Sequence, residues 1–249
     1  MSRGLGDVYK RQELGKINGK EYIVKTIVTT ETIKTIAERN GVEMYDVYTG
    51  FKWIANVMRE NEGKKNYIGG GEESYGFLCE DFVRDKDAVS ACVILAEIAA
   101  WAKDQGLSLY QLLQKIYVEY GFSKEKGISV VKKGKSGAEE IEAMMKKFRE
   151  NPLTEIAGSK VTYFYDYSTL KGKDYAENET VTLDMPTTSN VLQYFTEDNT
   201  KVSIRPSGTE PKIKFYCEVH SKVKSIDELP EAEKAAEEKI NQIKASLGI

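Results

Sequence analysis

The sequence is poor in histidine and cysteine. Its 249 residues include one histidine, His220, and three cysteines, Cys79, Cys92 and Cys217. The cysteines lie far apart with no Cys-X-X-Cys pair, so neither a disulfide framework nor a thiolate metal site is indicated. A single histidine excludes a histidine-based metal cluster. The natural setting for such a chain is a reducing cytoplasm.

The chain also lacks a charge surplus and a long apolar run. Its 36 Lys and Arg against 39 Asp and Glu leave a formal charge of −3, so we expect no nucleic-acid partner. The longest apolar stretch, residues 88–102, is interrupted by Ser90 and Glu97 and is shorter than the ~20 residues of a membrane span. The N-terminus has no apolar core behind its basic residues and does not resemble a secretory signal. We therefore expect no membrane partner.

Hydrophobic residues make up 41% of the chain, which is enough to form cores and excludes a disordered protein. At roughly 100–200 residues per domain, the length indicates one large domain or two ordinary ones. Residues 1–12 are polar and without periodicity. We interpret them as an unstructured lead, a cloning or gene-fragment scar, and exclude them from the fold.

The first half of the sequence alternates strand and helix patterns, which is typical of an α/β layer. We expect Thr49 to cap the second helix and Ser108 with Gln111 to form a capping box. The helix over residues 87–103 is apolar on nearly every side and should be buried. Strands are expected at residues 22–30, 44–48 and 67–68, and helices at residues 33–37, from 51, 87–103 and 109–120.

The second half changes to a period of two, with helices at either end, which favours an α+β domain. The Lys-, Gly- and Ser-rich segment 123–137 is the predicted domain boundary. We predict a three-layer α/β domain with a mixed sheet over residues 13–135, then a smaller α+β domain with an antiparallel sheet over residues 136–249. Helices are expected at residues 138–150 and from Pro230, and strands at residues 161–166, 181–183, 191–195, 202–204 and 213–219.

The segment RPSGTEPK between the last two predicted strands suits an anion with several acceptor oxygens. Arg205 can bind a phosphate with two hydrogen bonds, and Lys212 can add a point charge. Ser207 and Thr209 supply hydroxyl donors, while Gly208 lets backbone N–H groups approach the anion. Two prolines stiffen the segment. A tight polar turn with Arg205 on its rim is the alternative.

The segment GGGEESYG is a second candidate. It lacks the GKS or GKT ending of a phosphate loop, so the nucleotide-binding interpretation is weak. Glu72 and Glu73 beside the Ser74 hydroxyl instead suit a polyol, because carboxylates accept hydrogen bonds from vicinal hydroxyls. The alternative is an exposed turn. Lys52 lies in the first turn of its helix, where the dipole favours acids, and marks either an anion site or an ordinary surface lysine.

Together these motifs resemble the α-D-phosphohexomutase superfamily, most closely its bacterial α-phosphoglucomutases. The resemblance extends from about Glu13 to Ile249 through VKTIVTT, TGFKWI, GGGEESYG, VRDKD and RPSGTEPKIKFY, in that order. The Glu-Glu-Ser segment is similar to the glucose-type version of the family's sugar loop. The family often has a histidine after this segment, where Tyr75 and Gly76 stand here, so a dual glucose and mannose preference remains open.

The resemblance implies a role for each matching position. Glu72, Glu73 and Ser74 would hold the sugar hydroxyls, and Lys52 would contribute to the active-site cleft. Lys86 matches the family pattern but is equally explained by a structural ion pair. The substrate's non-reacting phosphate would be clamped by Arg205, Ser207, Gly208 and Thr209, with Lys212 nearby.

Enzymes of this family have four domains, of which the resemblance covers the third, sugar-binding, and the fourth, phosphate-binding. The catalytic phosphoserine loop and the metal loop are absent, so we expect no catalytic residue and no metal ligand in this chain. The implied function is the C-terminal fragment of a phosphoglucomutase, inactive alone, which interconverts glucose 1-phosphate and glucose 6-phosphate through a phosphoserine and a 1,6-bisphosphate.

Mg²⁺ and glucose 1,6-bisphosphate are the implied cofactors of the full-length family. The implied partners are a hexose phosphate substrate and the missing N-terminal half of the enzyme. The alternatives are a non-enzymatic sugar-phosphate-binding module, a phosphomannomutase fragment and a structural partner domain. The phosphohexomutase hypothesis requires Arg205 of the RPSGTEPK segment and the acidic residues Glu72 and Glu73 to face the same cleft.

Overall fold

The computed structural model describes residues 10–11, 13–132, 134–208 and 210–249, which form two compact units. The first unit extends to Gly121 and includes Lys222–Ile226; the second comprises Phe122–Ser221 and Asp227–Ile249. Of the expected lead, most lies outside the described residues. Lys10 and Arg11, however, have helical backbone, and the Lys10 ammonium lies 2.6 Å from the Glu97 carboxylate.

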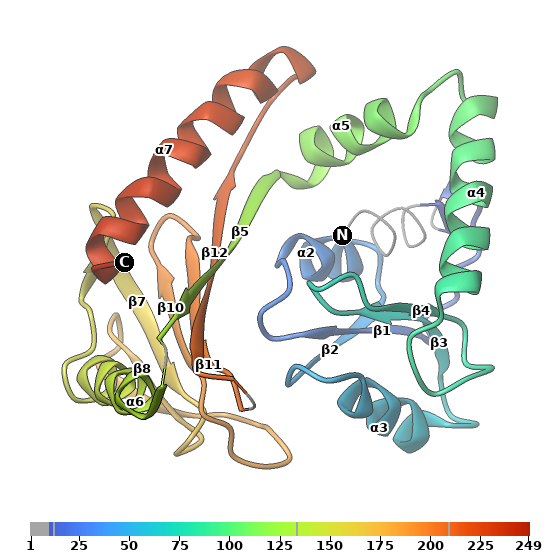
Figure 1. The fold of residues 1–249 in the computed structure, drawn as a ribbon. Helices are drawn as coiled ribbons and strands as arrows, with labels where there is room; N and C mark the ends of the chain where they lie inside the picture. Colours follow the sequence, from blue (N-terminus) through green and yellow to red (C-terminus); the bar gives the residue numbers. More distant parts are fainter. Residues whose placement is uncertain (1–9, 12, 133, 209) are drawn as a thin grey trace. The chain divides into compact units, whose positions relative to one another are not determined.

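The first unit is built on a four-stranded mixed sheet with strand order β2-β1-β3-β4 (Figure 1). β1 pairs in parallel with β2 and β3, and β4 is antiparallel to β3. The strands are β1 (Glu21–Thr26), β2 (Glu43–Val47), β3 (Asn66–Gly71) and β4 (Phe77–Cys79), and the helices are α2 (Thr32–Arg39), α3 (Phe51–Asn61), α4 (Ala88–Asp104) and α5 (Leu109–Tyr120).

Alternating residues of β1 build two separate cores. Ile23 packs on one face of the sheet in a cluster with residues of α2, α4 and α5. Tyr22 and Val24 point to the other face, where Ile54 and Met58 of α3 cover them. Because strand side chains alternate between faces, one continuous apolar strand serves both layers. The predicted three-layer α/β architecture with a mixed sheet is confirmed.

Two local predictions for this unit are wrong. β1 ends at Thr26 and not at residue 30, because the chain turns there, with the Thr29 N–H donating to the Thr26 carbonyl at 2.9 Å. The N-cap of α3 is Gly50 and not Thr49, and no side chain caps this helix. Gly50 has φ of 120°, a conformation in which glycine avoids the strain of a β-carbon.

The prediction that α4 is buried on nearly every side is also wrong. Its inner face is buried through Ala91, Ile94 and Ile98, but Val89 and Val93 on the opposite face are exposed. A helix that lies on a single sheet buries only one stripe, whatever its composition. Within the described part of the chain, no helix is long and apolar enough to cross a membrane.

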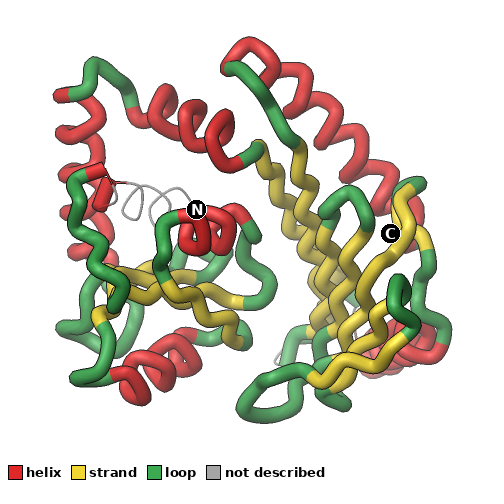
Figure 2. The backbone as a smooth tube through the Cα atoms, turned by 180° about the vertical axis from the view of Figure 1, so that it is seen from behind, coloured by secondary structure: helices red, strands yellow, loops and turns green. Residues whose placement is uncertain are grey.

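The second unit contains an antiparallel sheet with strand order β5-β12-β11-β10-β7-β8-β9, and β6 pairs with β7. Figure 2 draws the strands of this sheet in yellow. The strands are β5 (Phe122–Val131), β6 (Glu155–Ile156), β7 (Ser159–Asp166), β8 (Lys171–Asp174), β9 (Glu179–Thr182), β10 (Leu192–Thr196), β11 (Lys201–Pro206) and β12 (Lys212–Ser221). The helices are α6 (Gly134–Glu150), the short η1 (Ile226–Glu228) and α7 (Leu229–Leu247).

Helices cover one face of this sheet. Phe148 of α6 packs against Phe215 of β12 with ring centroids 6.4 Å apart, and its carbonyl accepts a hydrogen bond from Tyr194. On α7, which begins close to the expected Pro230, Ala236, Ile240 and Ile243 are buried at the spacing of one helix face. An antiparallel sheet with helices on one face is the predicted α+β fold.

The segment expected to be the domain boundary is a strand. β5 pairs along its whole length with β12, from Phe122 opposite Ser221 to Val131 opposite Lys212. It is an edge strand in which Lys, Glu, Gly and Ser replace most of the apolar alternation, so its composition resembles a loop. The two units therefore meet in the sequence at Gly121 and Phe122, earlier than the boundary expected at residue 135.

Candidate functional site

The carboxylate turn, residues 72–76, connects β3 to β4 in the first unit. It is closed by the Glu72 N–H, which donates to the Gly76 carbonyl at 2.8 Å. The Gly50 N–H donates to Oε1 of Glu72 at 2.6 Å, and the Thr26 hydroxyl donates to Oε2 of Glu73 at 3.2 Å. Ser74 lies exposed at the tip. Both acidic side chains are thus held in position with lone pairs left for a ligand.

The partners of this turn come from the carboxyl ends of parallel strands, where ligands bind in open α/β sheets. Thr26 is the last residue of β1, and Gly50 follows β2 directly before α3. These elements reach the turn from 47 and 22 residues away in the sequence. The arrangement of the turn therefore depends on the sheet.

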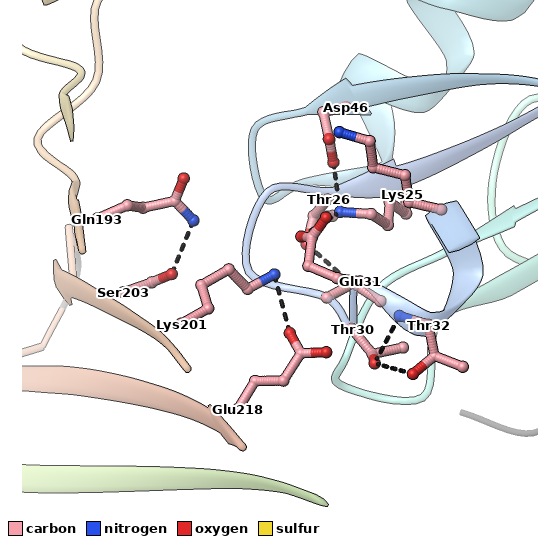
Figure 3. A network of polar contacts seen from close by, with 12 residues as sticks. Lys25, Thr26, Thr30, Glu31, Thr32, Asp46, Gln193, Lys201, Ser203 and Glu218 are labelled. Atoms are coloured by element: carbon pink, nitrogen blue, oxygen red, sulfur yellow. Dashed lines mark hydrogen bonds and ion pairs between the residues drawn. The ribbon is translucent and has the colours of Figure 1, made fainter. Parts of the chain in front are cut away.

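A fully buried lysine stiffens the same edge of the sheet (Figure 3). The Lys25 ammonium lies 2.6 Å from the Asp46 carboxylate and 3.0 Å from that of Glu31, and its side chain is 1% exposed. Burial alone would lower the pKa of Lys25, but the two carboxylates outweigh it and raise the pKa above its ordinary value. Lys25 is therefore charged and locks β1 to β2 beside the turn.

The three glycines that precede the turn belong to β3, which extends beyond the strand expected at residues 67–68. A β-carbon on Gly70 would lie 2.6 Å from both the Val24 carbonyl and the Tyr67 hydroxyl. One on Gly71 would lie 2.8 Å from the Gly76 carbonyl. Real β-carbons do not approach so closely, so the glycines allow the strand to pack tightly and deliver Glu72 to its position.

Lys86 lies beside the carboxylate turn, and Lys52 lies on α3, the helix whose N-cap Gly50 contacts that turn. Lys52 lies in the first turn of α3, exposed, with its ammonium 5.0 Å from the Trp53 ring centroid. A β-carbon on Gly76 would lie 3.3 Å from Cδ of Lys86 and 3.1 Å from the Glu72 carboxylate, so both side chains lie against this glycine. The sequence left Lys86 between a site role and an ion pair. The structure pairs its ammonium with Asp85 at 3.1 Å and also places it beside the turn.

The cationic turn, residues 205–212, joins β11 to β12 in the second unit. The Ser207 N–H donates to the Lys212 carbonyl at 2.8 Å, which closes the turn. Lys212 forms an ion pair with Glu210, and this contact lowers the pKa of the Glu210 carboxyl. An arriving anion must compete with Glu210 for Lys212, so Arg205 is the stronger anchor of the turn.

Sequence reasoning passed over one cation here. Lys214 pairs in register with Arg205 on the neighbouring strand, and both side chains therefore leave the sheet on the same face. The Lys214 ammonium lies 5.9 Å from the ring centroid of Tyr216. The strand period of two in KIKFY was the signal that could have found it, because it places Lys212 and Lys214 on one face.

The packing of the protein itself does not require a glycine at position 208. Its φ lies outside the left-handed region, and a β-carbon there would meet nothing within 4 Å. The space beside this glycine is therefore open to a ligand. Thr209, also predicted to bind phosphate, lies outside the described residues.

A buried polar row lies across β11, the strand that carries Arg205, and Figure 3 shows its members Lys201, Ser203, Gln193 and Glu218. Lys201, Ser203 and Arg205 share one face of β11, and the Lys201 ammonium lies 3.1 Å from the Glu218 carboxylate, with both side chains nearly inaccessible. Gln193 donates to Ser203 at 2.7 Å. Breaking such a buried network is costly, so β11 presents Arg205 from a rigid strand.

The predicted residues thus form two groups. Glu72, Glu73, Ser74 and Lys52 gather in the first unit around the start of α3, because the Gly50 N–H ties that helix to the turn. Arg205, Ser207, Gly208 and Lys212 gather in the second unit on one turn. Among the described residues, no group of three or more His, Cys, Asp or Glu side chains could hold a metal ion.

Comparison with known proteins identifies both units. Residues 6–120 match the family model "Phosphoglucomutase/phosphomannomutase, alpha/beta/alpha domain III", and residues 129–236 match "Phosphoglucomutase/phosphomannomutase, C-terminal domain". Phosphoglucomutase of Staphylococcus haemolyticus is 35% identical over 208 residues, covering 84% of this chain and 38% of that protein. Phosphoglucomutase of Staphylococcus aureus (strain bovine RF122 / ET3-1) is 38% identical over 208 residues, covering 84% of this chain and 37% of that protein.

Solved structures share the fold at lower identity. Parafusin, a phosphoglucomutase from Paramecium in its open form, superposes with a TM-score of 0.59 at 18% identity, covering 90% of this chain and 37% of that chain. A phosphoglucomutase/phosphomannomutase family protein from Burkholderia thailandensis gives 0.56 at 16% identity, covering 98% and 42%. The chain spans less than two fifths of the curated relatives above. It belongs to the phosphoglucomutase/phosphomannomutase family, of which it carries domain III and the C-terminal domain.

Proposed function

We propose that this chain is the sugar- and phosphate-recognition part of a phosphoglucomutase that interconverts glucose 1-phosphate and glucose 6-phosphate. The observation that carries the proposal is the fixed position of Glu72 and Glu73, whose carboxylates are held by the Gly50 N–H and the Thr26 hydroxyl. Carboxylates held in this way bind vicinal hydroxyls with little further loss of entropy. In the proposal they hold the hexose, with Ser74 beside them.

The cationic turn holds the phosphate that does not react. Arg205 supplies two parallel donors, Ser207 a hydroxyl, and Lys212 a point charge, with Gly208 leaving room for the anion. Each charged hydrogen bond contributes about 1.5–3 kcal/mol. Thr209 remains part of the proposed clamp, and Lys52 part of the proposed cleft. The proposed site contacts only the phosphate dianion and the sugar hydroxyls. It can therefore bind the bisphosphate in either orientation between half-reactions.

The transferring groups come from outside this chain in the proposal. The family reaction passes phosphate from a phosphoserine to the sugar through glucose 1,6-bisphosphate, and Mg²⁺ neutralises charge on the moving group. The residues described here bind and orient the substrate. We also propose a cytoplasmic location, because exposed Cys92 is a free thiol, which a reducing compartment maintains.

A phosphomannomutase is the second candidate. Tyr75, in place of the family's frequent histidine, is 89% exposed at the tip of the carboxylate turn and has φ of 68°. A large side chain held in the left-handed region beside the sugar ligands is the feature on which hexose preference depends in this proposal. Comparing glucose 6-phosphate with mannose 6-phosphate as ligands distinguishes the two candidates.

NMR titration of the pure chain tests the proposal. We expect millimolar binding of glucose 6-phosphate and of inorganic phosphate, with Arg205→Ala weakening both at least tenfold, as the loss of about 1.5–3 kcal/mol requires. Glu73→Gln should weaken glucose 6-phosphate and leave inorganic phosphate unchanged. Arg59→Ala, which removes an exposed arginine of α3 bonded to Asn56, is the matched control and should change neither.

Two results would contradict the proposal. Unchanged phosphate binding in Arg205→Ala would assign the cationic turn a structural role. Micromolar, saturable binding of the hexose phosphate to the chain alone would instead favour a free-standing sugar-phosphate-binding module.

A further inference from the structure

The chain contains two Asn-Gly pairs, Asn18-Gly19 and Asn40-Gly41. In such a pair the backbone nitrogen of glycine can attack the side-chain amide carbon of asparagine, because glycine has no β-carbon to obstruct the approach. The local sequence makes the two pairs equivalent. The structure gives them opposite environments, so only the first is arranged for this reaction.

The first pair lies in an exposed turn before β1. Asn18, Gly19 and Lys20 are all exposed, and a β-carbon on Gly19 would meet nothing within 4 Å. Gly19 has φ of 87°, in the left-handed region, and within the described part of the chain its N–H donates no hydrogen bond. The attacking nitrogen is therefore open to water, through which it must lose its proton.

The side chain of Asn18 is folded back over the residues that follow it. Its Oδ1 accepts a hydrogen bond from the Lys20 N–H at 3.3 Å, the arrangement of an Asx turn. The ring that this hydrogen bond closes includes the Gly19 nitrogen, so the amide carbon is held near its nucleophile, and such proximity accelerates an intramolecular reaction. During the attack negative charge develops on Oδ1, to which the Lys20 N–H already donates.

The second pair is held in an unreactive arrangement. Nδ2 of Asn40 donates to the Ile36 carbonyl at 2.7 Å and to the Tyr120 hydroxyl at 3.1 Å, which directs the side chain back over α2. The Gly41 N–H donates to the Glu38 carbonyl at 3.2 Å. The leaving amide and the attacking nitrogen are thus both engaged in hydrogen bonds, which must break before they can react.

We propose that Asn18 is a site of spontaneous deamidation in the folded chain, whereas Asn40 is protected. Hydroxide removes the Gly19 proton, and the nitrogen forms a bond to Cγ of Asn18. The bond from Cγ to Nδ2 breaks, and the amide leaves as ammonia after taking a proton from water. Water then adds to either carbonyl of the resulting succinimide and opens it to aspartate or isoaspartate. The net reaction consumes one water and releases one ammonia.

Deamidation at this turn changes the start of β1. The Asn18 and Lys20 N–H groups donate to Oε2 of Glu21 at 2.9 and 3.1 Å, and Glu21 is 5% exposed at the first position of the strand. The Asn66 N–H of β3 donates to the Lys20 carbonyl at 2.9 Å. A new carboxylate at residue 18 repels that of Glu21, and isoaspartate also lengthens the backbone and displaces these donors. The reaction therefore loosens β1 at its start.

Timed incubation of the intact chain at neutral and at mildly alkaline pH tests the proposal. Digestion after glutamate residues places the two asparagines on separate peptides, and mass spectrometry measures how fast each loses its amide. A parallel incubation in guanidinium chloride gives the rates of the same pairs without the fold. Asn40 is thus the matched control within the same molecule.

We expect Asn18 to deamidate at least about tenfold faster than Asn40 in the folded chain, since misplacing a reacting group by about 1 Å can cost about a hundredfold in rate. In guanidinium the two rates should become similar. The Asn18 rate should rise with pH, because the attacking nitrogen must lose its proton. Enzymatic methylation of isoaspartate should label the Asn18 peptide, and Asn18→Gln should abolish that label.

Equal rates for the two asparagines in the folded chain would overturn the inference, because the local sequence and not the structure would then decide. An Asn18 amide that stays intact in the folded chain but is lost in guanidinium would overturn it as well. Asn18→Asp, which reproduces one product, should lower the guanidinium midpoint, and an unchanged midpoint would refute the inferred effect on β1. These readouts need no sugar phosphate, so they are independent of the proposed function.

Discussion

Tyr22 shows how the fold changes the chemistry of one side chain. It is 2% exposed between the rings of Tyr45 and Tyr67, whose centroids lie 5.6 and 5.5 Å away. Burial disfavours the charged phenolate and raises the pKa of Tyr22 to about 12. The unfolded chain loses this proton near pH 10, two units earlier.

This difference predicts alkaline sensitivity. Between pH 10 and 12 the folded state holds a proton that the unfolded state has released, so the free energy of unfolding falls as the pH rises. Tyr22→Phe should make that decline shallower by up to about 1.4 kcal/mol per pH unit. Urea midpoints at several pH values measure it. Tyr110→Phe, at an exposed site, should leave the profile unchanged, and parallel profiles for wild type and Tyr22→Phe would contradict the prediction.

Residue types identified the candidate ligands, but not the groups that hold them. Adjacent carboxylates and a hydroxyl singled out Glu72, Glu73 and Ser74. The partners Thr26 and Gly50 carry no such signal, because they act from 47 and 22 residues away. The sequence indicated only that Lys25 belongs to a strand. A strand pattern does not show that the Lys25 ammonium contacts the Asp46 carboxylate.

At the scale of elements, β3 depends on its glycines. Strand interiors usually disfavour glycine, but here two neighbours occupy the space where a β-carbon of Gly70 would stand. Gly70→Ala should therefore destabilise the chain by about 1–3 kcal/mol, the usual cost of overpacking. Chemical denaturation measures this change.

Gly127 in β5 is the matched control. A β-carbon there would meet nothing within 4 Å, and its backbone lies outside the left-handed region. Gly127→Ala should be neutral or stabilising by up to about 1 kcal/mol, through the lower entropy of the unfolded chain. Equal destabilisation by both substitutions would show that strand propensity, and not close packing, is the reason for the glycines.

Periodicity predicted the elements that have two distinct faces. The helix over residues 109–120 with its capping box and the helix that begins near Pro230 were both found from the sequence, and each buries one face. The sequence did not predict β5, because an edge strand needs few apolar residues. Backbone pairing with β12 holds β5 in the sheet instead. α4 was misjudged for the opposite reason, since a helix can be apolar on a face that its own unit leaves exposed.

At the scale of the whole molecule, the chain is two units of one enzyme family. The proposed division of labour leaves binding here and phosphoryl transfer elsewhere. The pure chain should therefore show no conversion of glucose 1-phosphate to glucose 6-phosphate, even with Mg²⁺ and glucose 1,6-bisphosphate present. A coupled dehydrogenase assay measures this, with the Staphylococcus aureus enzyme as positive control. Turnover that persists after chromatography and disappears in Arg205→Ala would contradict the prediction.

The sequence by itself determined the family, the order of the two domains and the residue types of both turns. Those features are local, because they rest on adjacent residues and on periods of two and 3.6. Tertiary structure alone decided that Thr26 and Gly50 orient the carboxylates, that Lys214 joins Arg205, and that α4 keeps an apolar face exposed. The physical reason is that register and layer packing bring distant residues together, and no local spacing encodes those contacts.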